Sequence, residues 1–75
     1  MIEHQTVVLI EDHQDSGLKK GDIGAIVHRY EAGSAYEVEF VSGEGKTVAL
    51  LTLRDSEIRP ISDGEILHVR ELASA

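Results

Sequence analysis

The chain has 75 residues, and its 14 acidic and seven basic side chains give a formal net charge of −7 at neutral pH. A chain of this length forms one domain and buries only about 60% of the surface that its unfolded form exposes, so its hydrophobic core is thin. It contains no cysteine, which excludes disulfides and thiolate zinc sites and makes the cytoplasm the expected compartment.

No stretch of the sequence suits a membrane. The longest uninterrupted apolar runs, such as Val48–Leu51, are short, whereas a membrane-spanning helix needs about 20 residues. The N-terminus lacks the basic region and apolar core of a signal peptide, so we expect the protein to stay where it is made. Its acidic charge repels phosphate backbones and anionic lipids and favours a basic protein partner.

Two strands separated by a long loop are predicted for the first part of the chain. Thr6–Ile10 is rich in β-branched residues and too short for a helix, so it predicts a strand. Residues 11–22 are polar except for Leu18, which we expect to fold back onto the core. Ile23–Tyr30 predicts the second strand, in which Gly24 indicates a bulge or a sharp bend.

Alternation of apolar and acidic residues marks the next strand most clearly. After a turn over Glu31–Ser34, the stretch Tyr36–Val41 has the period of a half-buried strand. The glycines of Ser42–Gly45 predict a hairpin turn, and Lys46–Leu53 predicts the returning strand.

A short edge strand ends this pattern. Arg54–Glu57 is polar and predicts a tight turn, and Ile58–Ile61 follows it. Pro60 cannot donate to a strand ladder, so this strand is expected at an edge. The whole order predicts an all-β fold, an SH3-like small barrel of five strands over residues 1–61.

The tail, residues 62–75, is predicted to be a C-terminal extension that adds a sixth strand. Ser62 and Glu65 also have the spacing of a helix capping box, so a helix is the alternative. As a strand, Ile66–Glu71 would pair with the first strand of the same chain or of a second copy, which would make a homodimer. The pairing would bury Val7, Leu9, Leu67 and Val69.

Four segments carry a resemblance to a known family: Gly17–Val27, Ala35–Phe40, Ala49–Leu53 and Ile58–Pro60. Together they resemble a family of short bacterial proteins catalogued as domain of unknown function 4926, over roughly residues 5 to 61. The resemblance implies an SH3-like or KOW-like barrel, found beside toxin-like neighbours, with no established activity and no catalytic residues to carry over.

Candidate catalytic and metal-binding residues are few. Glu37 and Glu39 lie about 6.5 Å apart along one strand face, but an open face does not raise a carboxyl pKa for acid catalysis, so we expect a solvated surface. The loop Glu11–Asp15 holds three carboxylates and one imidazole, a weak arrangement for a divalent cation. The other histidines have no zinc-site spacing. We therefore expect no catalytic residue, no metal and no cofactor.

Binding surfaces are the remaining candidates. Adjacent apolar residues in a strand cannot all face one interior, so Val41, one of Val8 and Ile10, and one of Leu51 and Leu53 are expected outside. A protein-binding surface is expected to use the following residues: Glu37, Glu39, Val41, Glu44 and Asp55. A nucleic-acid-binding surface would instead use a basic edge: Lys19, Lys20, Arg29 and Lys46.

The expected function is that of a non-enzymatic protein-interaction module. Its sharpest form is an antitoxin or immunity-type protein that covers the basic cleft of a neighbouring toxin-like protein. The alternative is a KOW-like module that binds nucleic acid or the ribosome through its basic edge.

Overall fold

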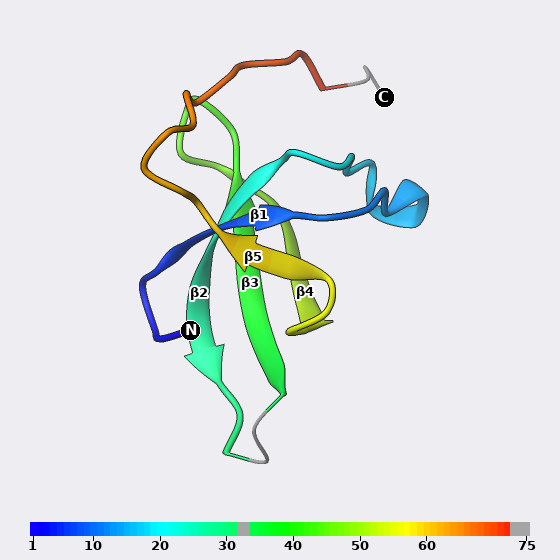
Figure 1. Ribbon diagram of the computed structural model, residues 1–75. Helices are drawn as coiled ribbons and strands as arrows, with labels where there is room; N and C mark the ends of the chain where they lie inside the picture. The colour runs from blue at the N-terminus through cyan, green and yellow to red at the C-terminus, as the bar shows by residue number, and fades with distance from the viewer. Residues whose placement is uncertain (32–33, 73–75) are drawn as a thin grey trace.

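Five antiparallel strands form one sheet in the order β4-β3-β2-β1-β5 in the computed structural model, which describes residues 1–31 and 34–72 (Figure 1). The strands are β1 (Thr6–Leu9), β2 (Ile23–Arg29), β3 (Ala35–Val41), β4 (Thr47–Arg54) and β5 (Ile58–Pro60), and one short 3-10 helix, η1, spans Gln14–Ser16. The all-β class and the five predicted strands are confirmed, with ends within a residue or two of those expected. The strands follow one another along the chain in the order expected from the sequence.

Strand β3 shows why the alternating pattern was informative. Its apolar residues Tyr36, Val38 and Phe40 are buried, while Glu37 and Glu39 between them are half-buried on the other face. Since side chains along a strand point to opposite faces in turn, the sequence pattern determines which face packs inward. Strand β4 pairs with β3 along its full length, so the hairpin expected from the glycine-rich turn is also confirmed.

The core is assembled from every strand and from one loop residue. Its buried members are Val7, Leu9, Leu18, Ile26, Tyr36, Val38, Phe40, Leu53 and Ile58. Leu18 belongs to the long loop between β1 and β2 and is only 3% exposed, as predicted. It stays inward because a backbone bridge joins it to His13 across the turn made by η1.

Gly24 has a different role from the one predicted. It pairs with Val7 in regular register, and the irregularity of β2 lies further along, between Ile26 and His28. A Cβ atom at Gly24 would lie 2.7 Å from Val38 Cγ1 and 2.9 Å from Phe40 Cε2. The glycine therefore leaves room for the Val38 and Phe40 side chains of the neighbouring strand to lie over β2. The β-branched Val27 occupies the bulge.

The predicted sixth strand does not form in residues 62–72. Strand β1 is hydrogen-bonded to β2 on one side and to β5 on the other, so it has no free edge for the tail. The expected burial of Leu67 and Val69 is also wrong, because these side chains are 66% and 89% exposed. The alternative helix is absent from these residues too. Residues 73–75 of the tail, and residues 32–33 of the predicted Glu31–Ser34 turn, lie outside the described residues.

No helix among residues 1–31 and 34–72 has the length and apolar character needed to cross a membrane.

Candidate functional site

The C-terminal segment, residues 62–72, begins with a turn that one arginine holds in place. Ser62 and Glu65 form one of the two contacts of the predicted capping box, since the Glu65 carboxylate accepts the Ser62 N–H at 2.8 Å, yet no helix follows in residues 66–72. Arg59 of β5 donates to both oxygens of the same carboxylate, at 2.7 and 2.6 Å. These bonds, the arginine's first, lower the pKa of Glu65 to about 2. The turn fixes the direction in which the chain leaves the sheet.

A second arginine attaches the far end of the segment to the loop before β2. Arg70 Nε and Nη2 donate to the two carboxylate oxygens of Asp22 at 2.7 and 2.6 Å, and Nη2 also donates to Gly17 O at 3.1 Å. The pair joins residues 48 positions apart. The hydrogen bond from Arg70 lowers the pKa of Asp22, against the opposing effect of partial burial.

Between these two attachments the apolar side chains face solvent. Ile66 is 90% exposed, Leu67 66% and Val69 89%. The backbone is open as well, because the N–H groups of residues 66–72 donate to no atom of the described chain. A tail held by its own apolar contacts would bury these residues. Here ion pairs hold the segment, and its apolar side chains and backbone donors are left available.

A groove of about 510 Å³ lies between this segment and the end of the β3–β4 hairpin, where the chain crosses above the hairpin in Figure 1. Its apolar lining includes Leu18, Ile23, Phe40 and Val48, together with Val41. Val41 is 53% exposed, so its predicted outward position is confirmed. Val69 and Leu72 of the segment also line this groove.

The other predicted outward apolar residues are partly corrected. Ile10 is exposed while Val8 is buried, as one of the two was expected to be. Leu51 and Leu53 both face the core, and the exposed leucine of this strand is Leu50, just before them, at 54%. Leu51 and Leu53 are two positions apart and share a face, so alternation itself places Leu50 outside.

The predicted acidic binding residues do not gather in one patch. Glu37 and Glu39 share the outer face of β3, where they accept hydrogen bonds from Thr52 and Thr47 of β4. Glu44 lies in the turn before β4 and Asp55 in the turn after it, at opposite ends of that strand. Of the predicted set, only Val41 borders the groove.

The predicted basic edge is also divided. Lys19 and Lys20 precede the start of β2, whereas Arg29 is the last residue of the same strand. All four residues of the set are exposed, Lys46 included. Asp22 accepts the backbone N–H of Lys19, and Asp12 accepts that of Lys20, so carboxylates lie close to these two lysines.

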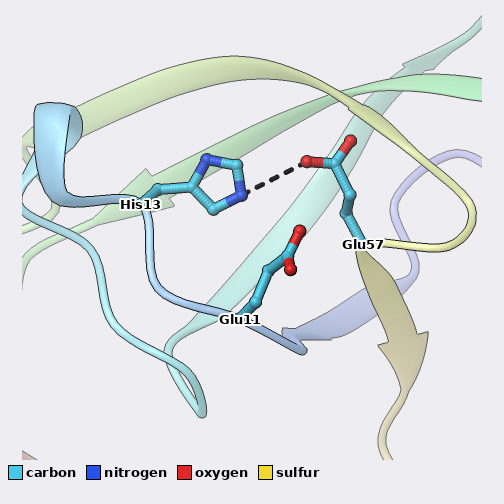
Figure 2. Close-up of side chains that lie close together, drawn as sticks. All are labelled: Glu11, His13 and Glu57. Atoms are coloured by element: carbon cyan, nitrogen blue, oxygen red, sulfur yellow. Dashed lines mark ion pairs between the residues drawn. The ribbon is translucent and has the colours of Figure 1, made fainter.

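The acidic loop after β1 contributes to a cluster of side chains that includes one residue from a distant part of the sequence. Its Glu11 and His13 converge on Glu57, which comes from the turn before β5 (Figure 2). Asp12 is engaged with the Lys20 backbone instead. The signal that could have located Glu57 is the pairing of β1 with β5, which is not local in sequence.

Comparison with known proteins gives one result. The model of the family described as "Domain of unknown function (DUF4926)" matches residues 3–60, which agrees with the resemblance seen in the sequence. No match was found among curated proteins or among solved structures.

Proposed function

The chain belongs to the DUF4926 family, and we propose that it is a non-enzymatic protein-interaction module of the cytoplasm that docks through its C-terminal segment. The observation that carries the proposal is the exposure of Ile66 and Val69, at 90% and 89%, on a segment held at both ends by bidentate ion pairs. Such a segment is already held in place at both ends, so less conformational entropy is lost when a partner binds it.

The mode of binding that fits these features is strand addition. An extended peptide with free backbone donors adds to the open edge of a partner's sheet, and its alternate side chains enter pockets. Ile66 and Leu67 are both exposed, so their side chains are available to such pockets, whereas Val69 also lines the groove beside Val41.

The partner's expected chemistry is an apolar pocket with a basic border. Arg59 and Arg70 are neutralised by Glu65 and Asp22, so the remaining charge near the segment is acidic. Asp63 and Glu71 form no ion pair with any described residue. The net charge of −7 acts in the same direction and would speed association with a basic protein.

Within this class we propose an antitoxin or immunity-type role. The partner would be a toxin-like protein encoded by a neighbouring gene, whose basic surface would normally contact nucleic acid. An acidic domain that covers this surface would block access of the substrate.

The nucleic-acid-binding alternative has less support, because its four basic residues are divided between the two ends of β2. A salt titration with generic RNA distinguishes the two functions, since phosphate contacts give a steep loss of affinity with salt. Salt-sensitive RNA binding that Lys19→Gln and Lys20→Gln remove would favour the alternative.

Substitution in the segment tests the proposal. We expect Ile66→Ser with Val69→Ser to weaken binding of the neighbouring gene's product at least tenfold, corresponding to about 1.4 kcal/mol. The melting temperature should stay unchanged, since both side chains are exposed. Ile2→Ser is the matched control, because Ile2 is 66% exposed but lies outside the segment. Equal binding by the double variant and the control would contradict the proposal.

A further inference from the structure

Three side chains from two distant parts of the chain meet at one end of the β1–β5 pair (Figure 2). Glu11 and His13 follow β1, and Glu57 precedes β5. The pairing of Leu9 with Ile58, continued by the Ile10 N–H bonded to Glu57 O at 2.9 Å, brings the two chain segments together. The backbone of the sheet therefore determines how close these side chains lie.

Three hydrogen bonds fix the backbone of His13, and this backbone positions the imidazole ring. His13 N donates to Leu18 O at 2.9 Å, and His13 O accepts the N–H groups of Ser16 and Leu18, both at 3.1 Å. Its side chain is 24% exposed, and its Nε2 atom is buried without a hydrogen-bond partner among the described residues. Glu57 Oε2 lies 3.3 Å from this nitrogen, outside hydrogen-bonding geometry. A buried ring nitrogen without such a bond, facing carboxylate oxygens, is an available ligand atom.

The Glu57 carboxylate is oriented by a hydrogen bond from the backbone of Arg54. Its Oε1 accepts the Arg54 N–H at 2.8 Å, which leaves Oε2 directed at His13. One ligand atom of each of the three residues lies within 4.8 Å of the others. Around a tetrahedral zinc ion, ligand atoms are about 3.4 Å apart for metal–ligand bonds of about 2.1 Å. The separation of His13 and Glu57 already has this value, so only Glu11, an exposed side chain, needs to rotate.

We propose that Glu11, His13 and Glu57 bind a divalent transition-metal ion such as Zn²⁺. One imidazole nitrogen and two carboxylate oxygens form a donor set that suits zinc and its neighbours, and a water completes the coordination. Calcium and magnesium are disfavoured, because they prefer oxygen ligands and in greater number.

The ion would fasten the long loop after β1 to the turn before β5. A small domain without disulfides gains stability from such a link, and binding to the folded state alone raises the melting temperature. No hydrogen bond or ion pair among the described residues joins Glu11, His13 or Glu57 to the C-terminal segment, so the site does not depend on the function proposed for that segment.

Calorimetric titration of the full chain with Zn²⁺ tests the site. We expect one ion per chain and a rise in melting temperature, whereas Mg²⁺ and Ca²⁺ should have neither effect. Co²⁺ should give the visible absorption of a four- or five-coordinate site.

Three variants locate the ligands. His13→Ala and Glu57→Gln should each raise the Kd for Zn²⁺ at least about tenfold, since even outer partners of metal ligands contribute that much. The glutamine retains an oxygen to accept the Arg54 N–H. Glu11→Gln alters only an exposed side chain and should not disturb folding. A raised Kd for Zn²⁺ in this variant therefore tests the site even if His13→Ala does not fold.

His68→Ala is the control, because His68 is an exposed histidine of the C-terminal segment. Its Kd should equal that of the unaltered chain. Absence of Zn²⁺ binding, or binding that survives all three ligand variants, would overturn the proposal and leave His13 and Glu57 as an ion pair only.

Discussion

Gly24 illustrates how much depends on a single missing side chain. The position lies in β2 beside β3, and a Cβ atom there would contact Val38, Phe40 and the Glu39 carbonyl at 2.7 to 3.0 Å. Two of these neighbours are themselves buried core side chains. The space cannot be made by moving an exposed group, so the strand pair would have to separate.

We therefore expect Gly24→Ala to lower the free energy of unfolding by about 1–3 kcal/mol, the usual cost of overpacking a core. Gly43→Ala is the control, because nothing lies within 4 Å of a Cβ atom there, and it should change stability by no more than about 0.5 kcal/mol. Urea titration followed by circular dichroism measures both. Equal stability of the two variants would show that β2 and β3 are not so closely packed.

At the scale of elements, the C-terminal segment depends on two carboxylates whose pKa values are lowered. A carboxyl group with a lowered pKa in the folded state contributes stability above its ordinary pKa and loses it as the pH falls through the lowered value. For Glu65 this range runs from 4.5 down to about 2. Asp22 is shifted in the same direction from 3.8. The segment should thus stay attached at pH 4 and be released only in stronger acid.

Carboxyl ¹³C chemical shifts followed by NMR measure this titration directly. Arg70→Gln should raise the pKa of Asp22 and leave that of Glu65 low, and Arg59→Gln should have the opposite pattern. If both carboxyl groups titrate normally in the unaltered chain, the ion pairs do not hold the segment in solution.

The strands could be predicted from the sequence because their signal is local. Tyr36–Phe40 alternates apolar and acidic residues, and the fold shows the same alternation in which side chains are buried. Whether the tail forms a strand could not be predicted in this way. Ile66–Glu71 has β-branched residues suited to a strand, but whether β1 offered a free edge depended on the distant β5. The same non-local pairing brought Glu57 to His13.

At the scale of the whole molecule, stability comes from the sheet and its core, whereas the C-terminal segment is attached from outside. Leu9 is 1% exposed, and replacing such a residue by alanine costs about 2–5 kcal/mol. A small domain has a total stability of only about 5 kcal/mol or slightly more.

Ending the chain after Ile61 should therefore lower the melting temperature much less than Leu9→Ala, for which a fall of at least about 10 °C is expected. Differential scanning calorimetry compares the two. A truncation as damaging as Leu9→Ala would mean that the segment belongs to the folding unit. Sedimentation of the unaltered chain as a dimer that truncation abolishes would identify a second copy as the segment's partner.

The most direct test of the account is amide hydrogen exchange in the complex with the neighbouring gene's product. Residues 66–72 donate no amide hydrogen bond to the described chain, so their amides should exchange rapidly in the free protein. Docking by strand addition predicts strong protection of these amides on binding, with β1 to β5 nearly unchanged. A complex that leaves residues 66–72 as unprotected as in the free chain would contradict the claim that this segment is the binding element.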